Sequence, residues 1–222
     1  MLPAMKRPAL TFSWQAAVRD EVMLPAQPYR ALREQLKTGD LVLFSGRTLS
    51  SRLVRIFTGS RWSHIGMVVR LPDMPGTPLL WEATRPSKVR DIFRGMPADG
   101  VQLVPLDDRV LSYEGHVAIR RLQGVSQDAS RRRCLEQLMD AWRDRPYHNF
   151  VRRFFGVLLR RDAGSPFRRG GFCSELVAEV YRQWRLLPSD RPAHHYVPRD
   201  FCHEEGHPQL RATLSPACLL AT

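Results

Sequence analysis

The chain has 222 residues, which is the length of one large domain or of one domain with extensions. Its composition, 43% hydrophobic and 25% charged, is that of a globular protein and excludes a disordered chain, a collagen and a coiled coil. Lysine and arginine number 34 against 22 acidic residues, so the formal net charge is +12, which favours nucleic acid, anionic lipid or acidic substrates as partners.

The first part of the chain is expected to lie at the edge of the fold. Pro25 and Pro28 interrupt it, and a short helix is predicted after them, ending at Leu36. The turn signal Thr38-Gly39-Asp40 then leads into the apolar run 41–44, which predicts the first strand of the core. We therefore expect a peripheral extension over residues 1–37, a folded domain over residues 38–205 and a tail over residues 206–222.

The middle of the chain predicts a helix followed by a run of strands. Residues 48–58 place Leu49, Leu53, Ile56 and Phe57 at helical spacing, and Gly59 ends this helix. Apolar runs separated by Pro and Gly favour an antiparallel meander of four strands: residues 64–70, 78–83, 101–106 and 116–122. Further helices are predicted over residues 130–143, 150–160 and 172–184. The fold class is therefore α+β, with helices around one antiparallel sheet.

Cys173 is the first candidate for chemistry, because it opens a predicted helix directly after Gly170 and Gly171. The helix dipole and the unpaired N–H groups of a first turn favour a thiolate, which is the nucleophilic form of cysteine. The same N–H groups can receive the oxyanion of a tetrahedral intermediate. The alternative is a small apolar side chain buried in the core, and position alone does not decide between the two.

His64 and Glu82 are candidates for the base and the orienting acid that a cysteine nucleophile needs. His64 opens a predicted strand, and Glu82 lies inside the apolar run 78–83. A carboxylate is costly to bury unless it is paired, and an imidazole on a neighbouring strand is a natural partner. The alternatives are a hydrogen-bonded histidine at a strand end and a solvent-facing glutamate.

Several ordered blocks of the chain together resemble one family. They are residues 38–44 (TGDLVLF), 59–66 (GSRWSHIG), 81–83 (WEA), 172–177 (FCSELV) and 196–201 (YVPRDF). They resemble the circularly permuted papain-like enzymes, the NlpC/P60 relatives of the YiiX/YaeF type, which are related to lecithin:retinol acyltransferase-like proteins.

The resemblance implies a permuted papain-like fold, in which an antiparallel sheet or half-barrel packs against the nucleophile helix. It implies Cys173 as the nucleophile, His64 as general base and acid, and Glu82 as the group that orients the imidazole, with no metal or organic cofactor. Members often carry Tyr-Asp where this chain has Tyr147-His148, so no role is assigned to an acid there.

The reaction type is predicted better than the substrate. One hypothesis is an amidase or peptidase, and another is a lipid hydrolase or acyltransferase acting at a membrane. The basic amphipathic segment 150–160 can lie on an anionic membrane, or it can pack on the core with a solvated basic face. The candidate contacts to substrate or membrane are Trp62, Tyr147, Arg152, Arg153, Phe154 and Phe155.

Two classes without acyl-transfer chemistry stay open as alternatives. A nucleic-acid-binding module rests on net charge alone, without an aromatic stripe or a helix-turn-helix pattern, so no specific nucleic acid is expected. A zinc site over Cys202, His203 and His207 lacks the second ligand pair.

The sequence has no apolar run of ~18 residues and no secretory signal, which predicts a cytoplasmic protein, although another export route remains open. The oligomeric state is also left open.

Overall fold

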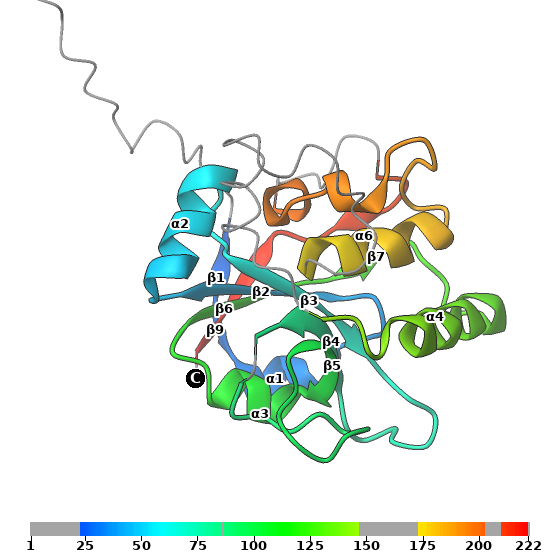
Figure 1. Ribbon diagram of the computed structural model, residues 1–222, viewed down its shortest axis with the longest axis horizontal. Coiled ribbons are helices and arrows are strands. Elements are labelled where there is room, and N and C mark those ends of the chain that lie inside the picture. The colour runs from blue at the N-terminus through cyan, green and yellow to red at the C-terminus, as the bar shows by residue number, and fades with distance from the viewer. Residues whose placement is uncertain (1–22, 86, 147–172, 203–209, 222) are drawn as a thin grey trace, which may run out of the picture.

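The protein is described here by a computed structural model that covers residues 23–85, 87–146, 173–202 and 210–221 (Figure 1). Its helices and strands follow one another as β1 (Met23–Pro28), α1 (Tyr29–Arg33), β2 (Leu41–Gly46), α2 (Leu49–Thr58), β3 (His64–Val69), β4 (Leu79–Thr84), β5 (Gly100–Pro105), α3 (Leu106–Leu111), β6 (Gly115–Arg120), β7 (Leu122–Gln123), α4 (Ala129–Trp142), α6 (Cys173–Gln183), β8 (Thr213–Leu214) and β9 (Ala217–Ala221). Two 3₁₀ turns, η1 (Ala193–His195) and η2 (Pro198–Phe201), follow α6.

Seven strands of the described residues form one open sheet in the order β1-β9-β6-β2-β3-β4-β5. The pairs are antiparallel except for β1 and β9, which run parallel. The first three strands of the predicted meander are neighbours in the sheet as β3, β4 and β5. The fourth, β6, does not follow β5 but pairs with β2 on the other side of the sheet, so the predicted order is wrong for this strand. A largely antiparallel sheet with helices around it confirms the α+β class.

Both faces of the sheet are covered, and the alternation of side chains along β2 shows how. Leu41 and Leu43 belong to a core cluster with α4 and α6, whereas Val42 and Phe44 belong to a cluster with α1 and α3. Figure 1 shows α6 on one side of the sheet and α1 and α3 on the other. Successive side chains of a strand point to opposite faces, so a strand buried on both sides is apolar throughout.

The sheet extends beyond the domain boundaries predicted from the sequence. Strand β1 comes from the predicted extension 1–37, and β9 from the predicted tail 206–222. Proline is tolerated in an edge strand such as β1, because one side of an edge strand needs no backbone N–H donor. Pro25 and Pro28 had argued against a strand here, and β1 was therefore not predicted. The helix α3 was also not predicted, because it is a short segment directly after β5.

The predicted helix of residues 48–58 is confirmed at both ends. The hydroxyl of Thr48 accepts a hydrogen bond from the backbone N–H of Ser51 at 3.2 Å, and Gly59 closes the helix in the left-handed conformation with φ 59°. The predicted helix over residues 150–160 lies outside the described residues. Within the described parts of the chain, we find no helix with the length and apolar character needed to cross a bilayer.

Candidate active site

His64 and Glu82 meet across neighbouring strands. His64 is the first residue of β3, Glu82 lies in β4, and the His64 Nε2 atom is 2.6 Å from Oε2 of Glu82. The imidazole ring also contacts the ring of Phe44 on β2, with the ring centroids 5.4 Å apart. The side chain of His64 is 12% exposed, whereas that of Glu82 is fully buried. The carboxylate therefore holds the imidazole from the buried side and leaves its other nitrogen, Nδ1, for proton exchange.

A glycine in β3 makes room for this pair. A Cβ atom at Gly66 would stand 2.8 Å from Cδ1 of Leu80 and 3.2 Å from Cβ of Glu82. A larger residue at this position would have to displace the side chain of Leu80 and shift that of Glu82. The His-Ile-Gly order of residues 64–66 therefore serves the position of the acid as well as that of the base.

Two further residues bind the carboxylate of Glu82. Gln102 on β5 donates from Nε2 to Oε1 at 2.7 Å, and Arg109 on α3 donates from Nε to the same oxygen at 2.8 Å. Burial alone raises the pKa of Glu82, but the charges of Arg109 and His64 and their hydrogen bonds outweigh it and hold the pKa well below its ordinary value. Glu82 is therefore an ionised acceptor with both oxygens occupied.

Arg109 is itself held in place by aromatic rings. Its guanidinium carbon lies 5.0 Å from the ring centroid of Phe44 and 5.2 Å from that of Tyr113. Sequence reasoning did not select Gln102 or Arg109. Gln102 could have been found in the sequence, because it is a polar residue in the apolar run 101–106. In the structure it pairs directly with Glu82 across β4 and β5. No sequence pattern indicated Arg109, because the helix that carries it was not predicted.

Cys173 is the first residue of α6, and its side chain hydrogen-bonds to His64. Burial lowers the pKa of His64, but the charge of Cys173, the hydrogen bond to Cys173 and the contact with Glu82 outweigh burial and raise the pKa to about 9. The raised value favours the imidazolium form of His64. The three residues predicted as a group are thus brought together by the fold.

Hydrogen bonds from other parts of α6 fix where the helix lies. The hydroxyl of Ser174 donates to the carbonyl of Tyr196 at 2.7 Å, and the hydroxyl of Tyr181 donates to the carbonyl of Gly39 at 2.8 Å. One face of the helix, with Leu176 and Val180 fully buried, packs on β3 and β4. The helix start, and the sulfur on it, are therefore placed by buried contacts along the whole helix.

Of the other predicted contact residues, Trp62 lies in the described part of the chain. Trp62 is fully buried in the core cluster that also contains Cys173, and its contact with substrate or membrane stays a prediction. The other expected contacts lie outside the described residues: Tyr147, Arg152, Arg153, Phe154 and Phe155.

The alternative zinc site is only partly described. His203 and His207 lie outside the described residues, and among the described ones no group of three His, Cys, Asp or Glu side chains is placed to hold a metal ion. The Cys202 sulfur donates to the carbonyl of Pro198 at 2.9 Å. All four cysteines lie in the described part of the chain, and no disulfide joins them.

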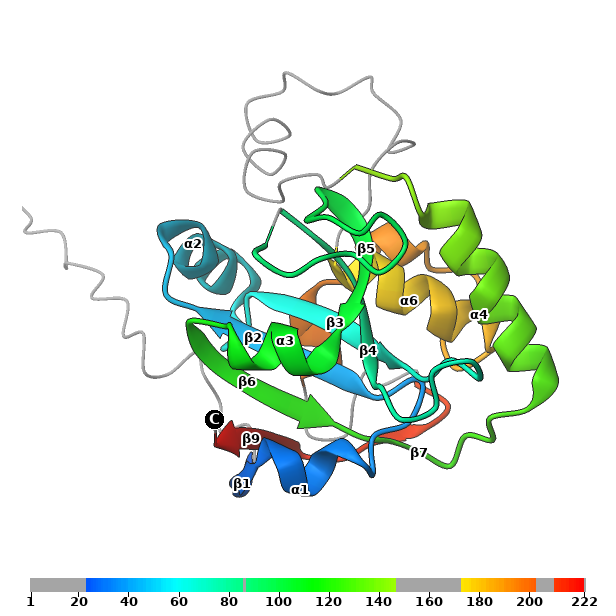
Figure 2. The same ribbon diagram turned by 90° about the horizontal axis from the view of Figure 1, so that it is seen from below.

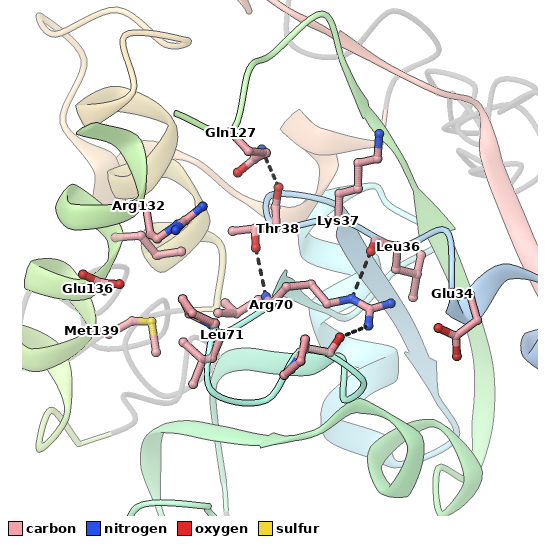
Figure 3. Close-up of a pocket in the computed structure, with 14 residues that line it drawn as sticks. Glu34, Leu36, Lys37, Thr38, Arg70, Leu71, Gln127, Arg132, Glu136 and Met139 are labelled. Carbon is pink, nitrogen blue, oxygen red and sulfur yellow. Dashed lines mark hydrogen bonds between the residues drawn. The ribbon is translucent and has the colours of Figure 1, made fainter. Parts of the chain in front are cut away.

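A separate pocket of about 530 Å³ lies at the far end of β3 (Figure 3). Arg70 lines it, six residues beyond His64, a separation of roughly 20 Å along a strand. Its guanidinium donates to the backbone carbonyls of Leu36, Pro75 and Arg33. The hydrogen bonds of Arg70 thus join the end of α1 and the segment after it to the loop between β3 and β4, and the pocket is distinct from the group around Cys173.

Comparison with known proteins adds a distant likeness in fold. No protein-family model matches the chain, and no curated protein matches it. Among solved structures, the fold is similar to the crystal structure of the metalloprotein yiiX from Escherichia coli O157:H7, with a TM-score of 0.48, 19% sequence identity, and coverage of 85% of this chain and 98% of that one. At this distance the likeness carries no statement about activity, which has to come from the geometry of the site.

Proposed function

We propose that the protein is a cysteine-dependent hydrolase that acts through a thioester, with Cys173, His64 and Glu82 as its catalytic group. The observation that carries the proposal is the continuous contact from sulfur to imidazole to buried carboxylate. A nucleophile, a base within hydrogen-bond reach and a third group that orients the base are the elements that this chemistry requires.

The proposed reaction begins with transfer of the Cys173 proton to His64. The thiolate attacks the carbonyl carbon of an amide or ester, and the first-turn N–H groups of α6 stabilise the resulting oxyanion. His64 then gives its proton to the leaving amine or alcohol as the bond to carbon breaks, which leaves a thioester on Cys173. A water molecule that loses its proton to His64 attacks the thioester, releases the carboxylic acid and restores the enzyme. Another acceptor in place of water makes the same site an acyltransferase.

Glu82 acts through the imidazole in this scheme. Its carboxylate accepts a hydrogen bond from the Nε2–H group of His64, which keeps the proton of the neutral imidazole on Nε2. The Nδ1 atom of His64 is then free to accept the proton from the sulfur of Cys173. Glu82 also stabilises the imidazolium that forms. Arg109 and Gln102 are positioning residues, because they touch Glu82 and not the reacting atoms.

The substrate class stays between two candidates. An amidase or peptidase is the first, since the group around Cys173 suits any acyl carbon with an amine leaving group. A lipid hydrolase or acyltransferase is the second, and it is favoured by two large apolar side chains that α2 exposes to solvent, Leu49 and Ile56.

Turnover of a panel of acyl-peptides and phospholipids tests the proposal. We expect at least one substrate to be cleaved, with loss of about 10³-fold or more in Cys173→Ala and in His64→Ala, and with a thioester on Cys173 detectable by mass spectrometry. Cys134→Ser is the matched control, because this cysteine lies on α4 away from the site. Full turnover by Cys173→Ala would refute the proposal.

A further inference from the structure

The apolar side of α2 faces solvent instead of the core. Leu49 is 72% exposed and Ile56, seven residues later on the same side, is 45% exposed. Leu53 lies between them on this side and is half-buried. The apolar stripe of a surface helix ordinarily faces the core, so a stripe at this spacing that faces outward needs a partner of its own.

The polar side of the same helix faces the sheet. Arg55 donates from Nη1 to the hydroxyl of Ser45 on β2 at 2.6 Å. Ser51 lies against Gly46, where an added Cβ atom would stand 2.6 Å from its hydroxyl oxygen. Thr58 is buried and donates to the carbonyl of Val54 at 2.8 Å. The contacts of Arg55 and Ser51 with β2 fix the rotation of α2 about its axis and hold the apolar side outward.

Exposed arginines lie around this apolar side. Arg47 and Arg52 are exposed and form no ion pair with any carboxylate of the described residues. The guanidinium of Arg199 lies over Gly59 at the end of the helix. The sequence has no acidic residue between Asp40 and Asp73. Glu114 is exposed next to Gly115, which pairs with Gly46. The charges of α2 itself, Arg52 and Arg55, are all positive and favour an anionic surface.

The helix α2 stands at the end of the sheet where the candidate catalytic group lies. It begins directly after β2, whose Phe44 pairs with His64, and it ends six residues before His64. Figures 1 and 2 show α2 at one end of the molecule and α4 at the other. A surface bound by α2 is thus brought to the His64 end of the sheet.

We propose that α2 docks the protein on an anionic membrane surface. Leu49, Leu53 and Ile56 enter the boundary between headgroups and acyl chains, and Arg47 and Arg52 contact the lipid phosphates. A projecting helix with an apolar ridge and flanking arginines fits a flat anionic layer. The docking stands without any catalytic activity, whereas a membrane-resident acyl lipid as substrate rests on the proposed function.

Sedimentation with phospholipid vesicles tests the docking. The full chain is mixed with vesicles of phosphatidylcholine alone and with vesicles that also contain phosphatidylglycerol. We expect binding to the second kind, weakened by salt, and reduced about tenfold or more both in Leu49→Glu/Ile56→Glu and in Arg52→Glu. Leu111→Glu is the matched control, since Leu111 is 67% exposed on α3 and should bind as the unchanged chain does.

Several results would overturn the docking. They are equal affinity for neutral and anionic vesicles, unchanged binding by the α2 variants, an equal loss in Leu111→Glu, or a dimer in solution that Leu49→Glu/Ile56→Glu dissociates. Binding is measured in parallel with Cys173→Ala. Vesicle binding by that variant together with an absence of turnover by the unchanged chain would remove the proposed function and leave the docking in place.

Discussion

Replacing Arg109 by Met tests whether the buried carboxylate depends on its guanidinium partner. Glu82 is fully buried, and its Oε1 atom accepts hydrogen bonds from Arg109 and Gln102. Removing one partner of a buried charge pair costs about 3–5 kcal/mol, since the remaining charge is left in a medium that solvates it poorly. That is a large part of the ~5–15 kcal/mol that stabilises a typical domain.

Equilibrium urea unfolding at neutral pH measures this cost. The double variant Arg109→Met/Glu82→Gln removes both charges, and we expect it to be more stable than Arg109→Met alone. Arg109→Lys keeps the charge without the fork geometry and should fall between the unchanged chain and Arg109→Met. A loss below ~1 kcal/mol in Arg109→Met, or a double variant less stable than the single one, would refute the reasoning.

The same substitution should change the response to acid. The pKa of Glu82 is lowered in the folded state, so its ionised form contributes stability above its ordinary pKa of 4.5, and this contribution is lost as pH falls toward about 2. Without Arg109 the effect of burial prevails and the pKa of Glu82 rises. The acid limb of the pH profile of turnover should therefore move to higher pH in Arg109→Met and stay in place in Arg109→Lys.

Three further outcomes follow from the structure. The pKa of His64 is raised to about 9, so its imidazolium adds stability that is lost as pH rises through that value. NMR titration of His64 should find a lower pKa in Cys173→Ala, and an unchanged pKa would contradict the contact between the two side chains. Gly66→Val should reduce turnover at least tenfold, since its Cβ presses on β4, whereas Gly76→Val, where an added Cβ meets nothing within 4 Å, should not; equal effects would contradict this. Leu176→Ala should cost about 2–5 kcal/mol in urea unfolding, and a loss below ~1 kcal/mol would show that α6 packs loosely.

Local patterns were sufficient for most of the strands and for selecting each candidate catalytic residue singly. The apolar runs that became β2 to β6 are each bounded by turn residues, and Cys173 opens its helix as predicted. The resemblance of short blocks around His64, Glu82 and Cys173 then joined three residues that no local pattern connects. The structure supplied the contacts between them.

Long-range pairing and side-chain direction were not predictable in the same way. The parallel pairing of β1 with β9 joins the two ends of the described chain. The sequence of neither segment indicates that the other is its pairing partner. Arg109 reaches Glu82 from a helix of six residues that has no strong pattern. The helix α2 was predicted from its apolar spacing, but spacing does not say whether the apolar side faces the core or solvent.

The rate of alkylation of each cysteine by iodoacetamide at neutral pH, followed by mass spectrometry, tests most directly whether His64 activates Cys173. Cys134 is the internal comparison, because it is more exposed than Cys173 and burial raises the pKa of its thiol. We expect Cys173 to react at least tenfold faster than Cys134, and this advantage to disappear in His64→Gln. If Cys134 reacted first and His64→Gln left the rate at Cys173 unchanged, no catalytic pair would exist between the sulfur and the imidazole.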